Sequence, residues 1–219
     1  MTAEATLRMD RMYRYQRHIY DLSRKFYLLG RDRLIRELAP APGARICEVG
    51  CGTGRNLVAL AGRYPDAEIF GIDASNQMLR TARAAVARAG LAGRIRIARC
   101  LADELDPGVT FGLGAPFDAI VFSYTLSMIP DWSRALDRAV AVLKPAGVLV
   151  VVDFSEQRRL PHWFRTLLRG WLALFHVTPR AGLPDYLRDL ARRERGTLMV
   201  EPLYADYACL MRYRRPSAL

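Results

Sequence analysis

Two short segments of the chain carry residues that could bind a nucleoside. Glycines occupy every second position in Gly50-Cys51-Gly52-Thr53-Gly54, two residues after Glu48, and a later apolar run ends at Asp73. Glycine lets a ligand approach the backbone closely, and an acid at the end of the next strand can accept hydrogen bonds from both hydroxyls of a ribose. The dinucleotide fingerprint differs, because its third glycine comes three residues after the second. The spacing therefore favours a nucleoside ligand over a dinucleotide.

A parallel sheet has to position these residues. Between residues 45 and 154, short apolar runs alternate with helical patterns, which is typical of βαβ units. This pattern predicts strands at 45–49, 68–72, 94–98, 118–123 and 148–154, helices at 55–63, 76–88 and 133–143, and a turn at 144–147. Two further β-rich runs, 197–203 and 207–213, are too close together for a helical crossover, so they predict an antiparallel pair.

Composition limits the class of protein. The chain has 219 residues, of which 51% are hydrophobic, so it is long and apolar enough for one α/β domain. Its 33 Lys and Arg against 22 Asp and Glu give a formal net charge of +11, which favours partners that carry phosphate, either nucleic acid or an anionic membrane. No apolar run is long enough to span a membrane, and residues 1–8 lack an apolar signal core, so we expect a cytoplasmic protein. The four cysteines lack a metal-ligand spacing, which predicts reduced thiols and no metal site.

Two basic segments lie outside the run of alternating strands and helices between residues 45 and 154. Residues 1–40 contain several tyrosines and arginines, with a helical pattern from Asp21, and could form either a lid over the nucleoside site or a helix packed on the sheet edge. The stretch 161–179, within a predicted insertion near 158–193, places tryptophan, phenylalanine and leucine at helical offsets. It could pack on the sheet, or lie among lipid headgroups with its arginines at the rim. We favour a lid within 1–40, a main domain at 41–219 and an interfacial insertion.

The glycine turn, Glu48 and Asp73 resemble motif I and the ribose-binding acid of class I S-adenosylmethionine (SAM)-dependent methyltransferases. The resemblance implies a Rossmann-like fold with seven mostly parallel strands and an antiparallel last strand, SAM as the cofactor and S-adenosylhomocysteine as its product. It places the cofactor against Glu48, Gly50, Cys51, Gly52, Asn56, Asp73, Ala74, Met78, Leu101, Ala102 and Ser123. Cys100-Leu101-Ala102 departs from the family's usual Gly-Asp-Ala, so the adenine amino group is expected to meet Asp103 or backbone alone.

Two longer blocks, Tyr13–Asp32 and Phe122–Ile129, resemble the N-methyltransferases of betaine-lipid synthesis. This closer resemblance implies three successive methylations of the amine of diacylglycerylhomoserine, with a homoserine-transferring lipid enzyme as the functional partner. It places Tyr20 and Tyr124 around the acceptor amine as catalytic residues, where tyrosine rings attract a methylated cation. It also places Tyr27 and Arg31 against the amino acid of SAM or the acceptor headgroup.

Other acceptors remain open at this stage. A phosphatidylethanolamine or small-molecule amine N-methyltransferase would show the same cofactor motif. A nucleic-acid methyltransferase is disfavoured, because Ser123-Tyr124-Thr125-Leu126 lacks the Asn/Asp-Pro-Pro-aromatic motif of the enzymes that methylate amino groups of RNA and DNA. We therefore expect a lipid amine substrate, no nucleic acid, and a cytoplasmic protein bound peripherally to the anionic inner face of the membrane.

Overall fold

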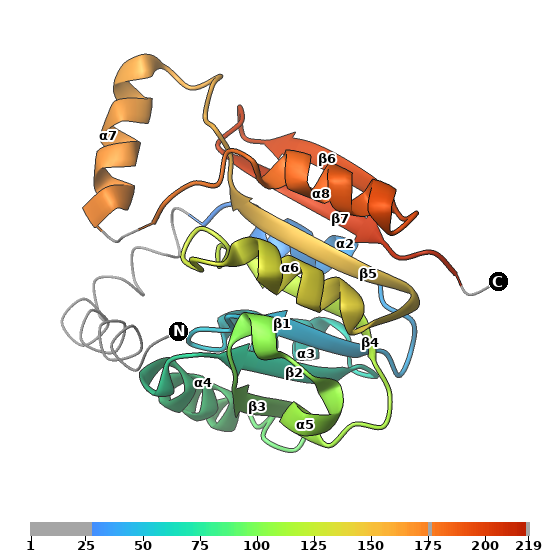
Figure 1. The fold of residues 1–219 in the computed structure, drawn as a ribbon. Helices are drawn as coiled ribbons and strands as arrows, with labels where there is room; N and C mark the ends of the chain where they lie inside the picture. The colour runs from blue at the N-terminus through green and yellow to red at the C-terminus, as the bar shows by residue number, and fades with distance from the viewer. Residues whose placement is uncertain (1–27, 175–176, 218–219) are drawn as a thin grey trace.

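The computed structural model describes residues 28–174 and 177–217, whose strands form one seven-stranded sheet in the order β3-β2-β1-β4-β5-β7-β6 (Figure 1). The strands are β1 (Arg45–Val49), β2 (Glu68–Asp73), β3 (Ile95–Arg99), β4 (Phe117–Ser123), β5 (Leu143–Phe154), β6 (Thr197–Leu203) and β7 (Ala208–Arg214). β1 to β5 are parallel, whereas β7 lies antiparallel between β5 and β6. The predicted fold class is confirmed.

Helices cover both faces of the sheet. They are α2 (Arg31–Glu37), α3 (Arg55–Arg63), α4 (Asn76–Arg88), α5 (Pro107–Phe111), α6 (Trp132–Ala141), α7 (His162–Leu174) and α8 (Leu183–Arg193), with a short 3-10 helix, η1 (Ala102–Glu104). α2, α3 and α4 contribute to one apolar core, and α5, α6 and α8 to the other. Figure 1 shows α6 and α8 in front of the sheet and α2 and α3 behind it.

Apolar periodicity explains how these helices attach. In α3, Leu57, Leu60 and Ala61 recur at offsets of three and four residues and are fully buried. The parallel strands are covered on both faces by helices. β4 is accordingly apolar from Ala119 to Phe122, and β5 is apolar from Val148 to Val152. The buried layers fix the carboxyl ends of β1, β2 and β4 at one edge of the sheet.

α7 is attached differently from the other helices. It stands away from the sheet in Figure 1, and only Leu168 and Leu172 on it are buried. Trp163, Leu167 and Leu174 are 70%, 67% and 68% exposed. The helix predicted within 161–179 is therefore present, and a second apolar stripe on it is left in contact with solvent.

Two predicted boundaries were wrong. The predicted turn at 144–147 belongs to β5, where the pairing with β4 shifts between Phe117 and Ala119 and Ala146 takes a positive φ of 61°. The helical pattern predicted from Asp21 to Arg36 is interrupted at Gly30, whose φ of 88° is left-handed, and α2 begins only at Arg31. Residues 1–27, including most of the predicted lid, lie outside the described residues, and the predicted boundary at residue 40 stays a prediction.

Candidate cofactor and acceptor site

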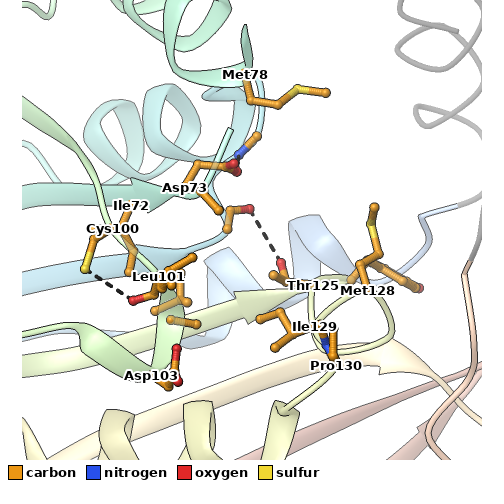
Figure 2. Close-up of a pocket in the computed structure, with 16 residues that line it drawn as sticks. Ile72, Asp73, Met78, Cys100, Leu101, Asp103, Thr125, Met128, Ile129 and Pro130 are labelled. Atoms are coloured by element: carbon orange, nitrogen blue, oxygen red, sulfur yellow. Dashed lines mark hydrogen bonds between the residues drawn. The ribbon is translucent and has the colours of Figure 1, made fainter. Parts of the chain in front are cut away.

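A cavity opens at the carboxyl ends of β1, β2 and β4. The strand order reverses between β1 and β4, and ligands of open α/β sheets bind at such a switch point. Residues from the glycine turn, the end of β2, the segment after β3 and the loop after β4 line the cavity. Figure 2 shows Leu101 and Asp103 on one side, facing Met128, Ile129 and Pro130 on the other. The predicted motif residues therefore meet at one place.

Asp73 is held in a fixed orientation at the end of β2. One carboxylate oxygen accepts a hydrogen bond of 2.9 Å from the backbone N–H of Gly52, and the other accepts one of 2.9 Å from Ser75. A carboxylate oxygen has more than one acceptor site, so both oxygens can also accept hydrogen bonds from a ligand. The geometry suits two neighbouring ribose hydroxyls, as the sequence predicts.

The glycine turn fits tightly against the loop that follows β4. Gly50 has φ 72°, and a Cβ atom added to it would lie 2.2 Å from Cγ2 of Thr125. The backbone N–H groups of Gly50 and Cys51 both donate to the Ile72 carbonyl, at 2.8 and 2.9 Å. Thr125, which sequence reasoning missed, is thus part of the wall beside the turn.

Polar residues gather on the other side of the turn, in a second cavity that Arg31, Glu48, Asn56 and Ser123 line. Asn56 donates to Oε1 of the buried Glu48 at 2.7 Å, which orients this carboxylate. The Ser123 hydroxyl is buried and has no hydrogen-bond partner within the described residues. A guanidinium, a carboxylate and an unused hydroxyl suit a zwitterionic amino acid, which is the methionine end of SAM.

The opposite end of the first cavity is mostly apolar. Met78, Leu101 and Ala102 line it, and Ala74 lies next to Asp73 at its edge. Asp103 also lines it, but its carboxylate forms an ion pair with Arg134 at 3.4 Å. The apolar walls suit an adenine ring. The residues present therefore fit SAM along its whole length.

Of the two predicted catalytic tyrosines, the structure describes only Tyr124. Tyr20 lies outside the described residues, as does Tyr27 among the predicted cofactor contacts. Tyr124 lines the cavity but is only 2% exposed, and its hydroxyl donates to the Leu29 carbonyl at 2.5 Å. Burial raises the pKa of this hydroxyl well above its ordinary value. Tyr124 is therefore poorly placed to exchange a proton, and its predicted contact with the acceptor rests on its ring.

The segment 124–130, which we call the acceptor loop, is tied down by residues distant in sequence. Arg180 donates to the Leu126 carbonyl at 3.2 Å and to the Ile129 carbonyl at 2.8 Å, and the backbone N–H of Thr178 donates to the Ser127 carbonyl. The buried Asp153 accepts a hydrogen bond of 3.2 Å from the backbone N–H of Ser127. Burial raises the pKa of Asp153 to about 6. No local sequence pattern signals these contacts.

The described part of the chain offers no donor set for a metal ion. Among the described residues, no group of three or more His, Cys, Asp and Glu side chains could hold a metal ion. Cys51 in the glycine turn is buried, and desolvation followed by the charge of Asp73 raises the pKa of its thiol well above the ordinary value. It contributes packing to the turn rather than a reactive thiolate.

No described helix has the length and apolar character needed to cross a membrane.

Known proteins are similar to this chain in sequence. Residues 46–147 match a family model described as "Methyltransferase domain". The chain is 37% identical over 134 residues to an O-methyltransferase, cnsE, of Penicillium expansum, covering 59% of this chain and 46% of the relative. It is 32% identical over 170 residues to the ubiquinone/menaquinone biosynthesis C-methyltransferase UbiE of Syntrophotalea carbinolica, covering 74% of this chain and 66% of that protein. The chain thus spans about half to two thirds of these relatives.

A solved structure supports the fold independently. The YcgJ protein of Bacillus subtilis superposes with a TM-score of 0.64 at 15% identity, over 86% of this chain and 99% of that one. At this identity the likeness concerns the fold alone. The family match, the relatives and a cavity that fits SAM lead to the same assignment. We conclude that the chain carries a class I methyltransferase domain, which uses SAM as its cofactor.

Proposed function

We propose that the protein is an N-methyltransferase that trimethylates the amine of diacylglycerylhomoserine to give a betaine lipid. One observation carries the proposal of an amine acceptor. The acceptor side of the cavity is formed by Tyr124, Thr125, Met128, Ile129 and Pro130. Within the described residues, this wall offers no carboxylate, imidazole or amine that could act as a general base. A wall of this kind suits an acceptor that is nucleophilic without help.

A neutral amine meets that requirement. SAM supplies a methyl group on a positively charged sulfur, which is already a good leaving group. In each transfer the amine lone pair would form the new C–N bond as the C–S bond breaks. The ammonium formed in the first and second transfers would pass a proton to water, whereas the third transfer would leave a quaternary ammonium with no N–H. A hydroxyl or carbon acceptor would instead need a base to remove its proton. The Tyr124 ring, held by its hydrogen bond to Leu29, would offer a π face to the growing cation.

α7 supports a lipid as the carrier of this amine. Its exposed Trp163, Leu167 and Leu174 and the net charge of +11 are what an interfacial helix uses on an anionic membrane. We therefore propose peripheral binding to the inner face of the membrane. An enzyme that transfers homoserine to a lipid would supply the acceptor.

The relatives favour a second candidate. The UbiE relative is named as a C-methyltransferase of ubiquinone and menaquinone biosynthesis, and the cnsE relative as an O-methyltransferase. A quinone precursor with an apolar tail would also use an exposed apolar helix at a membrane. Phosphatidylethanolamine is a third acceptor with the same amine chemistry as the first.

A panel of acceptors separates these candidates. Purified protein is incubated with SAM carrying a deuterated methyl group and with vesicles that contain diacylglycerylhomoserine, phosphatidylethanolamine or demethylmenaquinone. We expect up to three labelled methyl groups on diacylglycerylhomoserine, detected by mass spectrometry. Label on demethylmenaquinone alone would overturn the amine assignment, and label on phosphatidylethanolamine alone would replace the proposed headgroup.

A further inference from the structure

A second, basic cavity lies beside α7, separate from the cofactor site. We call it the arginine cavity, because Arg158, Arg165 and Arg169 line it together with Glu156 and Thr178. Its volume is about 730 Å³, which is large enough for a polar headgroup. Nothing in the cofactor chemistry uses these arginines.

The arginine cavity has more positive charge than its own residues neutralise. Arg158 forms an ion pair with the one acidic side chain, Glu156, and Arg169 donates to the Glu156 backbone carbonyl at 3.0 Å. The Arg165 side chain makes no hydrogen bond or ion pair within the part of the chain that the structure describes. Three guanidinium groups facing one carboxylate leave an excess of about two positive charges, which suits an anionic ligand.

The arginine cavity borders the wall of the cofactor site. The backbone N–H of Thr178, in the arginine cavity, donates to the carbonyl of Ser127 at 3.2 Å. The next residue, Met128, lines the cofactor cavity. The acceptor loop therefore lines the cofactor cavity and is hydrogen-bonded to a residue that lines the arginine cavity. A ligand that places an anionic group among the arginines could reach past this loop toward the methyl group of SAM.

The two sides of α7 have different chemistry. At about 100° per residue, Arg165 and Arg169 fall on a side of the helix well removed from Trp163 and Leu167. The apolar stripe can thus contact a membrane while the arginines face the cavity. A headgroup amine has to leave the plane of the membrane to reach SAM, so its neighbouring anionic group has to be held inside the protein as well.

We propose that the arginine cavity holds the carboxylate or phosphate of the lipid acceptor's headgroup, with Arg165 and Arg169 as the principal ligands. This assignment rests on the proposed function, because it takes the acceptor to be a lipid. It adds the residues that would select an acceptor whose amine lies close to an anion.

Calorimetry on the full chain, saturated with S-adenosylhomocysteine, tests the proposal. The lipid probe is dihexanoyl phosphatidylserine, which is water-soluble and carries an amine, a carboxylate and a phosphate; inorganic phosphate is the free-anion probe. We expect the double variant Arg165→Gln/Arg169→Gln to bind the lipid probe at least about tenfold more weakly than the wild type. Arg192→Gln, which removes an exposed arginine of α8, is the matched control and should bind as the wild type does.

Further measurements keep folding and function apart from the site. Equal affinity of all variants for S-adenosylhomocysteine shows that they are folded, and Arg165→Lys/Arg169→Lys should recover part of the binding. Unchanged affinity for the lipid probe in the double Gln variant would overturn the proposal, as would equally tight binding of inorganic phosphate to the wild type. A wild type that binds the probe through these arginines but methylates no lipid amine contradicts the proposed function, and not the site.

Discussion

The cofactor half and the acceptor half of the site are held together in different ways. Around β1 and β2, the contacts are local or between adjacent strand ends, as where Asp73 accepts from Gly52 and Ser75. Around the acceptor loop, the contacts come from distant segments, as where Arg180 donates to the carbonyls of Leu126 and Ile129. The first half is therefore specified by a short motif, and the second by tertiary packing.

This difference divides binding from selectivity. The backbone turn contacts the invariant ligand, SAM, whereas the acceptor loop, which is held by Thr178 and Arg180 of the segment after α7, contacts the acceptor. The two relatives described above carry names that indicate O-methyl transfer and C-methyl transfer. Variants on either side of this division should therefore affect different measured quantities.

The largest effect is expected where the two halves join, at Tyr124. Its ring is buried and packs edge-on against Phe154, so Tyr124→Ala should lower the free energy of unfolding by about 3–5 kcal/mol. Tyr124→Phe removes only the hydrogen bond to Leu29 and should cost about 1 kcal/mol. Urea denaturation measures both. If Tyr124→Ala were as stable as Tyr124→Phe, the ring would not hold this junction.

Asp153 makes the stability of the acceptor half depend on pH. Its pKa of about 6 in the folded protein exceeds the ordinary value of 3.8, so the folded state binds this proton more tightly than the unfolded state. The resulting stabilisation amounts to about 3 kcal/mol well below the unfolded pKa of 3.8, and it is lost as the pH rises through 6.

Asp153→Asn cannot ionise, which isolates this contribution. The stability of the wild type minus that of the variant, measured by urea denaturation from pH 4 to 7, should fall by about 2.4 kcal/mol over that interval. A constant difference across the interval would show that Asp153 does not carry a raised pKa.

On the cofactor side, Asp73→Ala should weaken binding of S-adenosylhomocysteine by about 2 kcal/mol, or about thirtyfold, because it removes a charged hydrogen-bond acceptor. Calorimetry gives the dissociation constant. Asp189→Ala, which removes an exposed carboxylate from α8, is the matched control and should not change it. Unaltered affinity in Asp73→Ala would remove this residue from the ribose site.

The smallest effect is expected at the surface of α7. Trp163→Ser/Leu167→Ser should reduce co-sedimentation with vesicles of phosphatidylglycerol and phosphatidylcholine about tenfold, without changing the affinity for S-adenosylhomocysteine. Met199→Ser, on β6, removes a similarly exposed apolar side chain (65%) and serves as the control. Binding of the wild type should also weaken with salt, because exposed charges are screened within about 10 Å at 0.1 M. Equal sedimentation of the Trp163→Ser/Leu167→Ser variant and the Met199→Ser control would contradict an interfacial role for α7.

The sequence predicts the locally specified cofactor half of the molecule better than the acceptor half, which depends on distant segments. The bounds of β1, α3, α4 and β6 were predicted to the residue, because apolar periodicity and the glycine turn act locally. The turn expected at 144–147 was wrong, because these residues form an irregular part of β5 whose backbone bonds to the distant residues 215 and 216. Arg180 and Asp153 could not be assigned to the acceptor loop, since each lies more than 20 residues away from it in the chain.

The site residues show the same limit. Asp73 and the glycines could be assigned to the site from residue type and spacing alone, because a short local motif forms this turn and the strand end beside it. The engagement of the Tyr124 hydroxyl by the Leu29 carbonyl depends on how residues 28–30 cross the end of the sheet, which spacing does not encode. Burial of a side chain by a distant segment is the information that a single sequence lacks.

The central claim is that a SAM-binding half built from a local motif delivers methyl groups to a lipid amine. Its most direct test is mass spectrometry of lipids from a host that expresses this chain together with a homoserine-transferring lipid enzyme. The Asp73→Ala variant serves as the comparison with impaired cofactor binding. We predict trimethylated diacylglycerylhomoserine with the wild type and a strongly reduced amount with the variant. Accumulation of unmethylated diacylglycerylhomoserine in both hosts would contradict the account.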